Sequence, residues 1–401
     1  MTRWKTMAIV AAAVFPGAAR ADVGDLTMSG FGTLGAVRIN TDSAQFVRDL
    51  RQNSGAGKTL DFSVDSRLAL QLDYRFDDAF SLTIQALAQK NRDGNFKPEL
   101  EWANIKYRLD QAWSFRAGRM GTPLFLISDS RNVGYASPWV RPPVDVYSQA
   151  ASSYFDGIDA NWSGKLGGGT ARLQPYFGLA PSRLRPDFDV KLRKMAGLNS
   201  TYEYGAWLFR AGYMYSRLDG ESPSLDSLFE AMRDVGRIPG LAQWRDAAAA
   251  LETRAKKTSF AGVGLAFDDD TWLVQAEYTQ RRVESFIGDT DGWYATLGYR
   301  LGTVMPYLTH AAVQGHRNTA ADSLLAPSPE LAGLKSIVRG VSGAGTQKTT
   351  GVGVRWDVYR NIALKAQFDR IRTERGRDSW MLKPADGKSV NVYSLAADFV
   401  F

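Results

Sequence analysis

Hydrophobic and polar residues alternate over long stretches of the chain. From Leu60 to Phe76 the even positions are Leu, Phe, Val, Ser, Leu, Leu, Leu, Tyr and Phe, while the odd positions are mainly Asp, Ser, Arg and Gln. A period of two residues indicates a β-strand with one apolar and one polar face. The alternation recurs in 80–89, 272–281, 293–300, 352–358 and 362–369. Its length suits tilted membrane strands, which need roughly 9–11 residues, better than the short strands of a soluble β-sandwich.

Short and long connections alternate between these stretches. The short ones centre on Asp77-Asp78, Asp110-Gln111, 167–169, Gly205, 268–270, Gly302 and Arg360-Asn361. The long ones fall at about 40–58, 91–97, 121–151, 181–189, 219–256, 284–290, 317–345 and 375–388. Fifteen connections join sixteen strands. The sequence therefore predicts an all-β protein, a transmembrane antiparallel β-barrel of about 16 strands, with long extracellular loops and short periplasmic turns.

The first residues are typical of a secretory signal peptide. A basic start with Arg3 and Lys5 precedes an apolar run at 7–15, and Ala19-Arg20-Ala21 is a small-x-small cleavage site. The apolar run is too short for a membrane helix, which needs about 20 residues. We predict a signal peptide at 1–21 and an outer-membrane β-barrel at 22–401.

Composition excludes several functions. The chain has no cysteine and two histidines, His310 and His316, so thiolate metal sites, cysteine nucleophiles and most zinc chemistry are excluded, and no metal or cofactor is expected. Strand parity predicts that both histidines face inward. Three of the 49 basic residues and none of the 42 acidic ones lie in the predicted signal peptide, which leaves a net charge of about +4. That small excess does not favour nucleic-acid binding.

The end of the chain carries a family resemblance. In the stretch 390–401, Tyr393, Leu395, Ala397, Phe399 and Phe401 share one face. This strand, the signal, the strand count and the segment 116–123 together resemble the Gram-negative outer-membrane general porin family of the sixteen-stranded, trimeric type. The resemblance implies a homotrimer in the bacterial outer membrane, surrounded by lipid and lipopolysaccharide. It further implies that Phe401 is an assembly signal for the barrel-assembly machinery, and that a third loop, about 121–151, folds inward.

The resemblance also locates a pore constriction. Arg116 and Arg119 lie near the start of the third loop, which itself contains Asp129, Arg131, Arg141 and Asp145. We predict that these six residues form the constriction, although Arg119 has the opposite strand parity to Arg116, so a bulge must intervene or one of them faces away. The Pro-Glu-Phe-Gly-Gly stretch of well-known enterobacterial porins is missing from this loop. Architecture is therefore expected to transfer from the family, but pore selectivity is not.

Strand parity also predicts basic residues on the lumen wall. These are Arg67, Arg75, Lys106, Arg108, Arg210, Arg281, Arg300 and Arg355, and basic inward residues outnumber acidic ones. Basic residues in a pore raise the local concentration of anions, so a mild anion preference is expected.

The loop at about 219–256 is predicted to contain two helices. The first starts near Pro223 with Ser224 as its N-cap, and the second runs from Leu241 with Trp244, Ala248 and Leu251 on one stripe. The loop is expected to fold as an external cap. A segment that enters the pore and a lid that binds a partner are the alternatives.

The predicted function is a porin, a water-filled channel for passive diffusion of small hydrophilic solutes, and not an enzyme. A substrate-specific uptake channel, for example for small carboxylates, is the first alternative. An outer-membrane enzyme barrel is a remote one, because it needs a serine and a histidine on the outer face near the membrane interface. The sequence does not identify the solute.

Overall fold

Sixteen antiparallel strands form a closed barrel. The computed structural model describes residues 25–150, 152–185, 188–343, 345–374, 387 and 389–401, so the predicted signal peptide lies outside the described residues. Each strand pairs with its neighbours in sequence, and β1 (Asp25–Ile39) pairs with β16 (Ser389–Val400) to close the ring. Closure leaves no unpaired strand edge, which a bilayer requires because lipid offers no hydrogen-bond partner. The fold class is confirmed.

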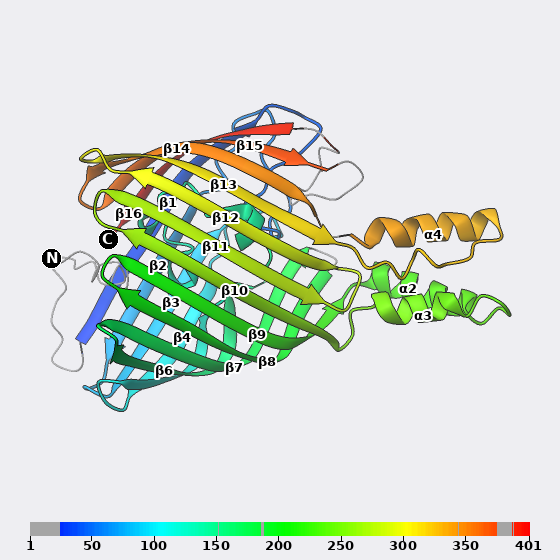
Figure 1. Cartoon of the computed structure of the whole chain (residues 1–401), viewed down its shortest axis with the longest axis horizontal. Coiled ribbons are helices and arrows are strands. Elements are labelled where there is room, and N and C mark those ends of the chain that lie inside the picture. Colours follow the sequence, from blue (N-terminus) through cyan, green and yellow to red (C-terminus); the bar gives the residue numbers. More distant parts are fainter. Residues whose placement is uncertain (1–24, 151, 186–187, 344, 375–386, 388) are drawn as a thin grey trace.

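The remaining strands follow in chain order around the ring (Figure 1). They are β2 (Arg67–Arg75), β3 (Phe80–Gln89), β4 (Glu99–Arg108), β5 (Trp113–Gly121), β6 (Tyr154–Leu166), β7 (Gly169–Arg185), β8 (Phe188–Tyr204), β9 (Trp207–Glu221), β10 (Lys256–Asp268), β11 (Trp272–Val283), β12 (Asp289–Tyr299), β13 (Val304–His316), β14 (Gln347–Tyr359) and β15 (Ile362–Thr373).

All seven predicted short turns lie at one end of the barrel, where both described chain ends also lie (Figure 1). Three of them are closed by the same pattern of hydrogen bonds. The side chains of Asp77, Asp110 and Asp269 each accept hydrogen bonds from backbone amides two and three residues further along the chain. Such turns let an aspartate close a tight connection without help from neighbouring strands.

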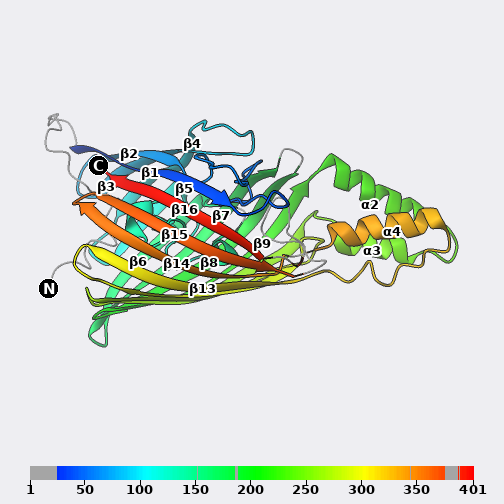
Figure 2. The ribbon, with the colours of Figure 1, turned by 90° about the horizontal axis from the view of Figure 1, so that it is seen from above.

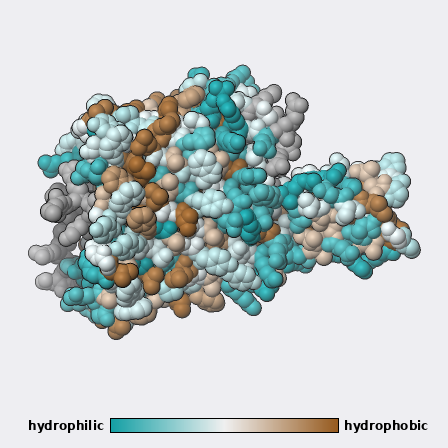
Figure 3. Space-filling view, in the orientation of Figure 1, coloured by the Kyte–Doolittle hydropathy of each residue, from teal (hydrophilic) through white to brown (hydrophobic). Residues whose placement is uncertain are grey.

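The outward face of the barrel is apolar. Leu34, Ile158 and Leu395 are 58–68% exposed and point away from the lumen. Aromatic residues gather near the short-turn end, where Trp272 packs against Tyr299, and the outer surface over the barrel wall shows mostly apolar and weakly polar colours (Figure 3). This is the distribution of a membrane-spanning barrel. None of the helices in the described segments is long and apolar enough to cross a bilayer.

Two predicted strand boundaries are wrong. The stretch 60–76 is not one strand, because the Asp61 carboxylate accepts hydrogen bonds from Ser63 and from the amide of Val64 and so turns the chain, and β2 starts only at Arg67. The predicted long loop at 181–189 is mostly strand. There β7 and β8 continue to 17 residues each, with Ser182 paired to Val190.

Three helices project from the long-loop end as a separate bundle (Figures 1 and 2). They are α2 (Pro223–Val235) and α3 (Gln243–Leu251) from the predicted helical loop, and α4 (Pro329–Val341), which the sequence analysis missed. Their apolar faces meet around Trp244 and Met232. The N-cap of α2 is Ser222, whose side chain accepts from the amide of Leu225, and not the predicted Ser224. The bundle extends away from the barrel rather than into it (Figure 2).

Candidate functional site

The third loop, described at residues 122–150, 152 and 153, lies inside the barrel. It leaves β5 and runs through two short 3-10 turns and helix α1 (Val144–Tyr147) before entering β6. The indole nitrogen of Trp139 donates to Thr296 and Thr309 on the inner face of the opposite wall, both at 3.0 Å. The Tyr135 hydroxyl reaches the carbonyl of Arg360 in a turn at the periplasmic end. The prediction of an inward-folded third loop is confirmed.

Basic residues of the barrel wall hold the backbone of this loop. Arg67 donates to the carbonyl of Asn132 at 2.7 Å. In the same way Arg210 donates to Leu126, Arg281 to Gln149, and Arg355 to Tyr135 and Ser137. A loop with little regular structure leaves many carbonyls unpaired, and guanidinium groups supply the missing donors. Half of the predicted lumen-wall residues therefore position the third loop.

Two predicted constriction residues are anchors of the loop. The guanidinium of Arg141 is buried between the carboxylates of Asp65 and Asp369, at 2.6 Å and 3.4 Å. Asp145 is also buried and accepts from Gln347 and Thr349 on β14, both at 3.1 Å. Burial raises the pKa of Asp145 to about 6, although these hydrogen bonds lower it in part. Neither residue lines the described cavities of the lumen.

Arg116 and Arg119 lie on opposite faces of β5. Arg116 faces the lumen and pairs with Asp159 on β6. Arg119 shares the outward face with Phe115, pairs with Asp156 at 2.7 Å and lies over the Tyr154 ring. The backbone keeps its alternation through this stretch, so no bulge turns Arg119 inward. Arg119 consequently does not line the lumen.

The first loop, residues 40–66, also enters the barrel, which the sequence analysis did not foresee. Phe46 is buried with Val144 of the third loop and with inward residues of β15 and β16. Its side chain lies 4.7 Å from the Arg141 guanidinium, and Arg48 donates to Gln89 on β3. The sequence of the first loop has no hydrophobic periodicity that would indicate where the loop lies. Its position inside the barrel is evident only from its packing against the third loop.

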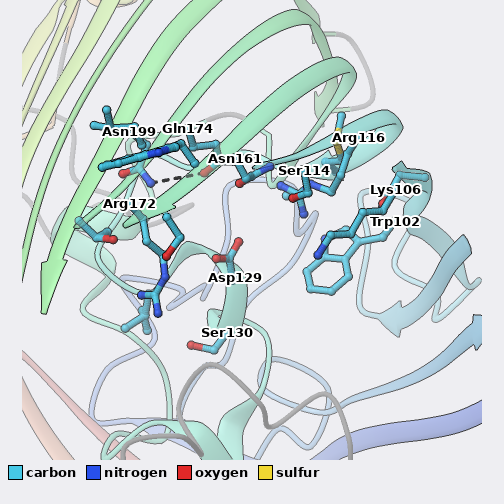
Figure 4. A pocket seen from close by; sticks show the side chains of 18 of the residues that line it. Trp102, Lys106, Ser114, Arg116, Asp129, Ser130, Asn161, Arg172, Gln174 and Asn199 are labelled. Atoms are coloured by element: carbon cyan, nitrogen blue, oxygen red, sulfur yellow. Dashed lines mark hydrogen bonds between the residues drawn. The ribbon is translucent and has the colours of Figure 1, made fainter. Parts of the chain in front are cut away.

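Two large cavities lie on either side of the third loop. The inner cavity, about 1220 Å³, opens toward the periplasmic turns and is lined by strands β1–β9. Lys106, Arg116, Asn161 and Gln174 point into it, with Asp129 of the third loop across from them (Figure 4). The outer cavity, about 510 Å³, lies between the third loop and the base of the helical bundle.

The region between the two large cavities, which we call the neck, is closely packed. It contains two small cavities of about 10 and 30 Å³, both lined by Arg131 and Asn132. The lower one shares Asp129 and Trp102 with the inner cavity, and the upper one shares Ser148 with the outer cavity. The first and third loops therefore meet the barrel wall between the two large cavities.

Charges of both signs surround the neck. Arg131 faces Asp129 of its own loop, Glu101 of β4 and Asp49 of the first loop. Burial would raise the pKa of Asp49, but the charge and hydrogen bonds of Arg51, 2.8 Å away, hold it below its usual range. Arg131 forms no ion pair within the described residues and lies 5.7 Å from the Phe125 ring. Of the six predicted constriction residues, only Asp129 and Arg131 line the neck.

The other predicted wall residues lie toward the periplasmic end. Lys106 and Arg108 line the inner cavity. Arg300 lies in the turn after β12 and pairs with Asp268, and Arg75 is exposed at the end of β2.

The two histidines face outward, contrary to the prediction. His310 contacts the Trp293 ring and shares a hydrogen bond with Thr350, and His316 pairs with Asp291. The inward face of β13 is instead occupied by apolar residues such as Tyr307 and Ala311, which pack against the third loop. Polar residues therefore do not mark the lumen face where a loop covers the wall.

Comparisons with known proteins agree with this architecture. The model of the Gram-negative porin family matches residues 8–376. OmpF of Salmonella typhi in complex with daunomycin is 10% identical with a TM-score of 0.57, and covers 95% of this chain and 98% of its own. A loop-deletion mutant of OmpT from Vibrio cholerae is 11% identical, with a TM-score of 0.55 and coverage of 95% and 100%.

The outer-membrane channel DcaP of Acinetobacter baumannii is 14% identical with a TM-score of 0.54, and covers 94% of this chain and 97% of its own. A comparison with functionally curated proteins found no match. At these identities the solved structures support the fold, while the family model covers most of the chain. The chain belongs to the Gram-negative porin family and is a channel of the bacterial outer membrane.

Proposed function

We propose that the channel is water-filled and lets small hydrophilic solutes diffuse passively, with a mild preference for anions. The route runs from the outer cavity through the neck to the inner cavity. Two of the constriction residues expected from the sequence, Asp129 and Arg131, would act at the neck together with Asp49 and Glu101. Arg141 and Asp145 would fix the loop that forms it.

The charge along this route is the observation that carries the anion preference. Among the described lining residues, eight are basic, namely Arg48, Lys106, Arg108, Arg116, Arg131, Arg172, Arg210 and Arg281, and five are acidic, namely Asp49, Glu101, Asp110, Asp129 and Glu203. The excess is small, and Arg172 and Glu203 of this set form an ion pair with each other. A modest positive potential favours anions without excluding cations.

Reversal potentials in a planar bilayer under a potassium chloride gradient test this proposal. The sign that corresponds to chloride permeating faster than potassium is expected, with a ratio of only a few. A clear preference for potassium would contradict the anion preference while leaving the channel itself intact.

We propose further that the protein has no enzymatic activity. An enzyme barrel would need a serine beside an outward histidine, whereas His310 shares a hydrogen bond with a threonine and His316 with an aspartate. A sensitive assay with a fluorogenic ester in detergent should give no turnover above that of a heat-denatured sample.

The assembly is also proposed on family grounds. A homotrimer is expected, and one OmpT structure from Vibrio cholerae is described as a trimer form. Export by a signal peptide at 1–21, contacts with outer-membrane lipid and lipopolysaccharide, and reading of Phe401 by the barrel-assembly machinery complete the proposal. In the structure Phe401 closes the ring through hydrogen bonds between its backbone and that of Gly30.

A further inference from the structure

We propose that a basic patch on the outer wall of the barrel, formed by Lys348, Arg370 and Arg372, binds the phosphate groups of an anionic lipid of the outer leaflet. This rests on the lipopolysaccharide contact proposed above on family grounds and gives that contact a site. All three side chains are exposed. They lie on the outward faces of β14 and β15, because Thr349 and Ile371, which have the opposite parity, contact the third and first loops inside the barrel.

The strand register brings the three cations together. Lys348 and Arg372 are direct partners across the β14–β15 pairing, and Arg370 pairs with Thr350 on the same outward face. Directly opposite residues have Cβ atoms about 5 Å apart, and the next residue on the same face of a strand is about 7 Å away. Like charges directly opposite each other destabilise a sheet. An anion bound between them would remove this repulsion.

No carboxylate among the described residues pairs with the patch. None of the three side chains forms an ion pair or a hydrogen bond in the part of the chain that the structure describes. Asp369, next to Arg370 in the sequence, faces the lumen and pairs with Arg141. Glu374 follows Arg372 on the outward face but forms no ion pair with it. The repulsion within the patch is therefore not relieved by a carboxylate of these segments.

Other outward-facing arginines toward the extracellular end are paired. Arg282 on β11 pairs with Asp291 at 2.9 Å, and Arg119 on β5 pairs with Asp156 at 2.7 Å. The sequence between Glu374 and β16 contains four basic and two acidic residues, so it adds no net negative charge. The patch is thus a local excess of positive charge on the outer wall.

The patch lies at the height of lipid head groups. The strand β15 has 12 residues and ends on the side of the barrel that carries the helical bundle (Figure 1). At about 3.4 Å per residue and a tilt of about 40°, such a strand rises roughly 28 Å, slightly more than the apolar band of about 25 Å. Arg370 and Arg372 are near its extracellular end. Just below them the rings of Phe368 and Tyr393, 5.3 Å apart, form an interfacial girdle.

The chemistry of the patch and of the wall below it selects the occupant. Guanidinium groups form paired hydrogen bonds with phosphate oxygens, and a lysine ammonium adds a point charge. Below the patch, Val352 and Leu364 are exposed on the same outward face and offer an apolar surface to acyl chains. A phosphorylated lipid would contact both parts, whereas inorganic phosphate would contact only the cations.

Native mass spectrometry of the detergent-solubilised protein tests this proposal. The probes are lipid A with two phosphates, which is the anchor of lipopolysaccharide, and the same lipid after its phosphates have been removed. The phosphorylated form should half-saturate the protein at a concentration about tenfold lower. Inorganic phosphate at the same concentration as the lipid should not displace it. Equal binding of both lipids, or displacement by inorganic phosphate, would overturn the inference.

Charge variants assign the preference to the patch. Lys348→Gln with Arg372→Gln removes the opposed pair and should raise the half-saturating concentration of phosphorylated lipid A about tenfold, the loss expected for one charge-assisted hydrogen bond. Arg237→Gln with Arg245→Gln removes the same charge from exposed side chains of the helical bundle and should leave binding unchanged. Unchanged binding in the patch variant would contradict the proposal.

Two further variants guard against a folding defect, which heat-modifiable migration on gels would reveal. Lys348→Arg with Arg372→Lys keeps both charges and should bind phosphorylated lipid A as the wild type does. Arg370→Gln removes a single charge and should weaken binding about threefold. Loss of binding in the exchange variant, or wild-type binding in Arg370→Gln, would count against the patch.

The same spectra report the oligomeric state. A variant lacking Lys348 and Arg372 that changes its oligomeric state but keeps the preference for phosphorylated lipid would identify a second copy of the chain as the occupant and overturn the inference. Conductance of the wild type in potassium chloride separates this proposal from the channel function. If the protein conducts without preferring phosphorylated lipid, the lipid site is wrong and the channel stands. If it prefers phosphorylated lipid without conducting, the site stands and the channel function fails.

Discussion

At the residue scale, the inward-facing arginines divide into two groups by their surroundings. Arg67 and Arg355 donate hydrogen bonds to carbonyls of the third loop, whereas Arg108 and Arg116 line the inner cavity. Strand parity alone places all four on the inward face. It could not separate the groups, because the difference depends on where the loop lies and not on the strand.

The histidines show where residue-scale reasoning fails. His310 is polar and was expected in the lumen, yet it lies outward against Trp293. Apolar residues also occupy the inner face of this strand, since Tyr307 packs there against the third loop. Alternation identifies the lumen face only where water, and not protein, fills the space beside the strand.

Removing the charge of Arg131 should reduce the anion preference. A unit charge 4 Å from an ion contributes about 1 kcal/mol in water, so Arg131→Gln should lower the chloride-to-potassium permeability ratio by up to about fivefold. Reversal potentials under a salt gradient measure the ratio. Arg245→Gln, on the exposed side of the helical bundle, is the matched control and should keep the wild-type ratio. A wild-type ratio in Arg131→Gln would remove this residue from the proposed constriction.

Asp145 should make the docking of the third loop sensitive to pH. Its pKa of about 6 lies above the usual 3.8. At pH values between these two, the folded state still binds a proton that the unfolded state has lost. The contribution of Asp145 to stability is therefore fully present below pH 4 and is lost as pH rises to about 6, by up to about 3 kcal/mol.

Asp145→Asn keeps the acceptor for Gln347 and Thr349 and removes the titration. Urea unfolding at pH 4 and pH 8 should show a smaller difference in the variant than in the wild type. The variant should be at least as stable as the wild type at pH 8. A variant that loses stability equally at both pH values would show that the carboxylate is needed for reasons other than its charge state.

At the element scale, the strands and short turns could be predicted from sequence because each carries its own signal. Alternation marks the strands, and Asp77, Asp110 and Asp269 close their turns with their own side chains. The first loop and α4 lack such signals. Phe46 is buried only because the third loop and the β15–β16 wall meet it, and α4 depends on α2 and α3 for its apolar partners.

The helical bundle projects away from the barrel mouth, so it should contribute little to electrical resistance (Figure 2). Replacing both helical segments, 223–251 and 319–341, with short glycine-serine links should leave single-channel conductance in potassium chloride unchanged, because the neck limits the current. Removing both segments avoids exposing the apolar face of α4. A marked rise in conductance would show that the bundle obstructs the mouth.

At the scale of the whole molecule, a closed ring of strands surrounds a lumen that two loops divide. The ring satisfies its own backbone and presents apolar residues to lipid. Arg141 and Asp145 attach the third loop to the barrel wall through buried contacts. The neck is therefore held in place by the barrel itself. The account depends on water and ions passing through this neck.

The absence of cysteine allows a direct measurement of that passage. Asn132→Cys places a single thiol in the neck, and Leu34→Cys places one on the lipid-facing surface as a control. A small water-soluble methanethiosulfonate reagent, added to open channels in a bilayer, should reduce the current of Asn132→Cys in discrete steps and leave Leu34→Cys unchanged. Full, unaltered current through Asn132→Cys after labelling confirmed by mass spectrometry would contradict a route through the neck.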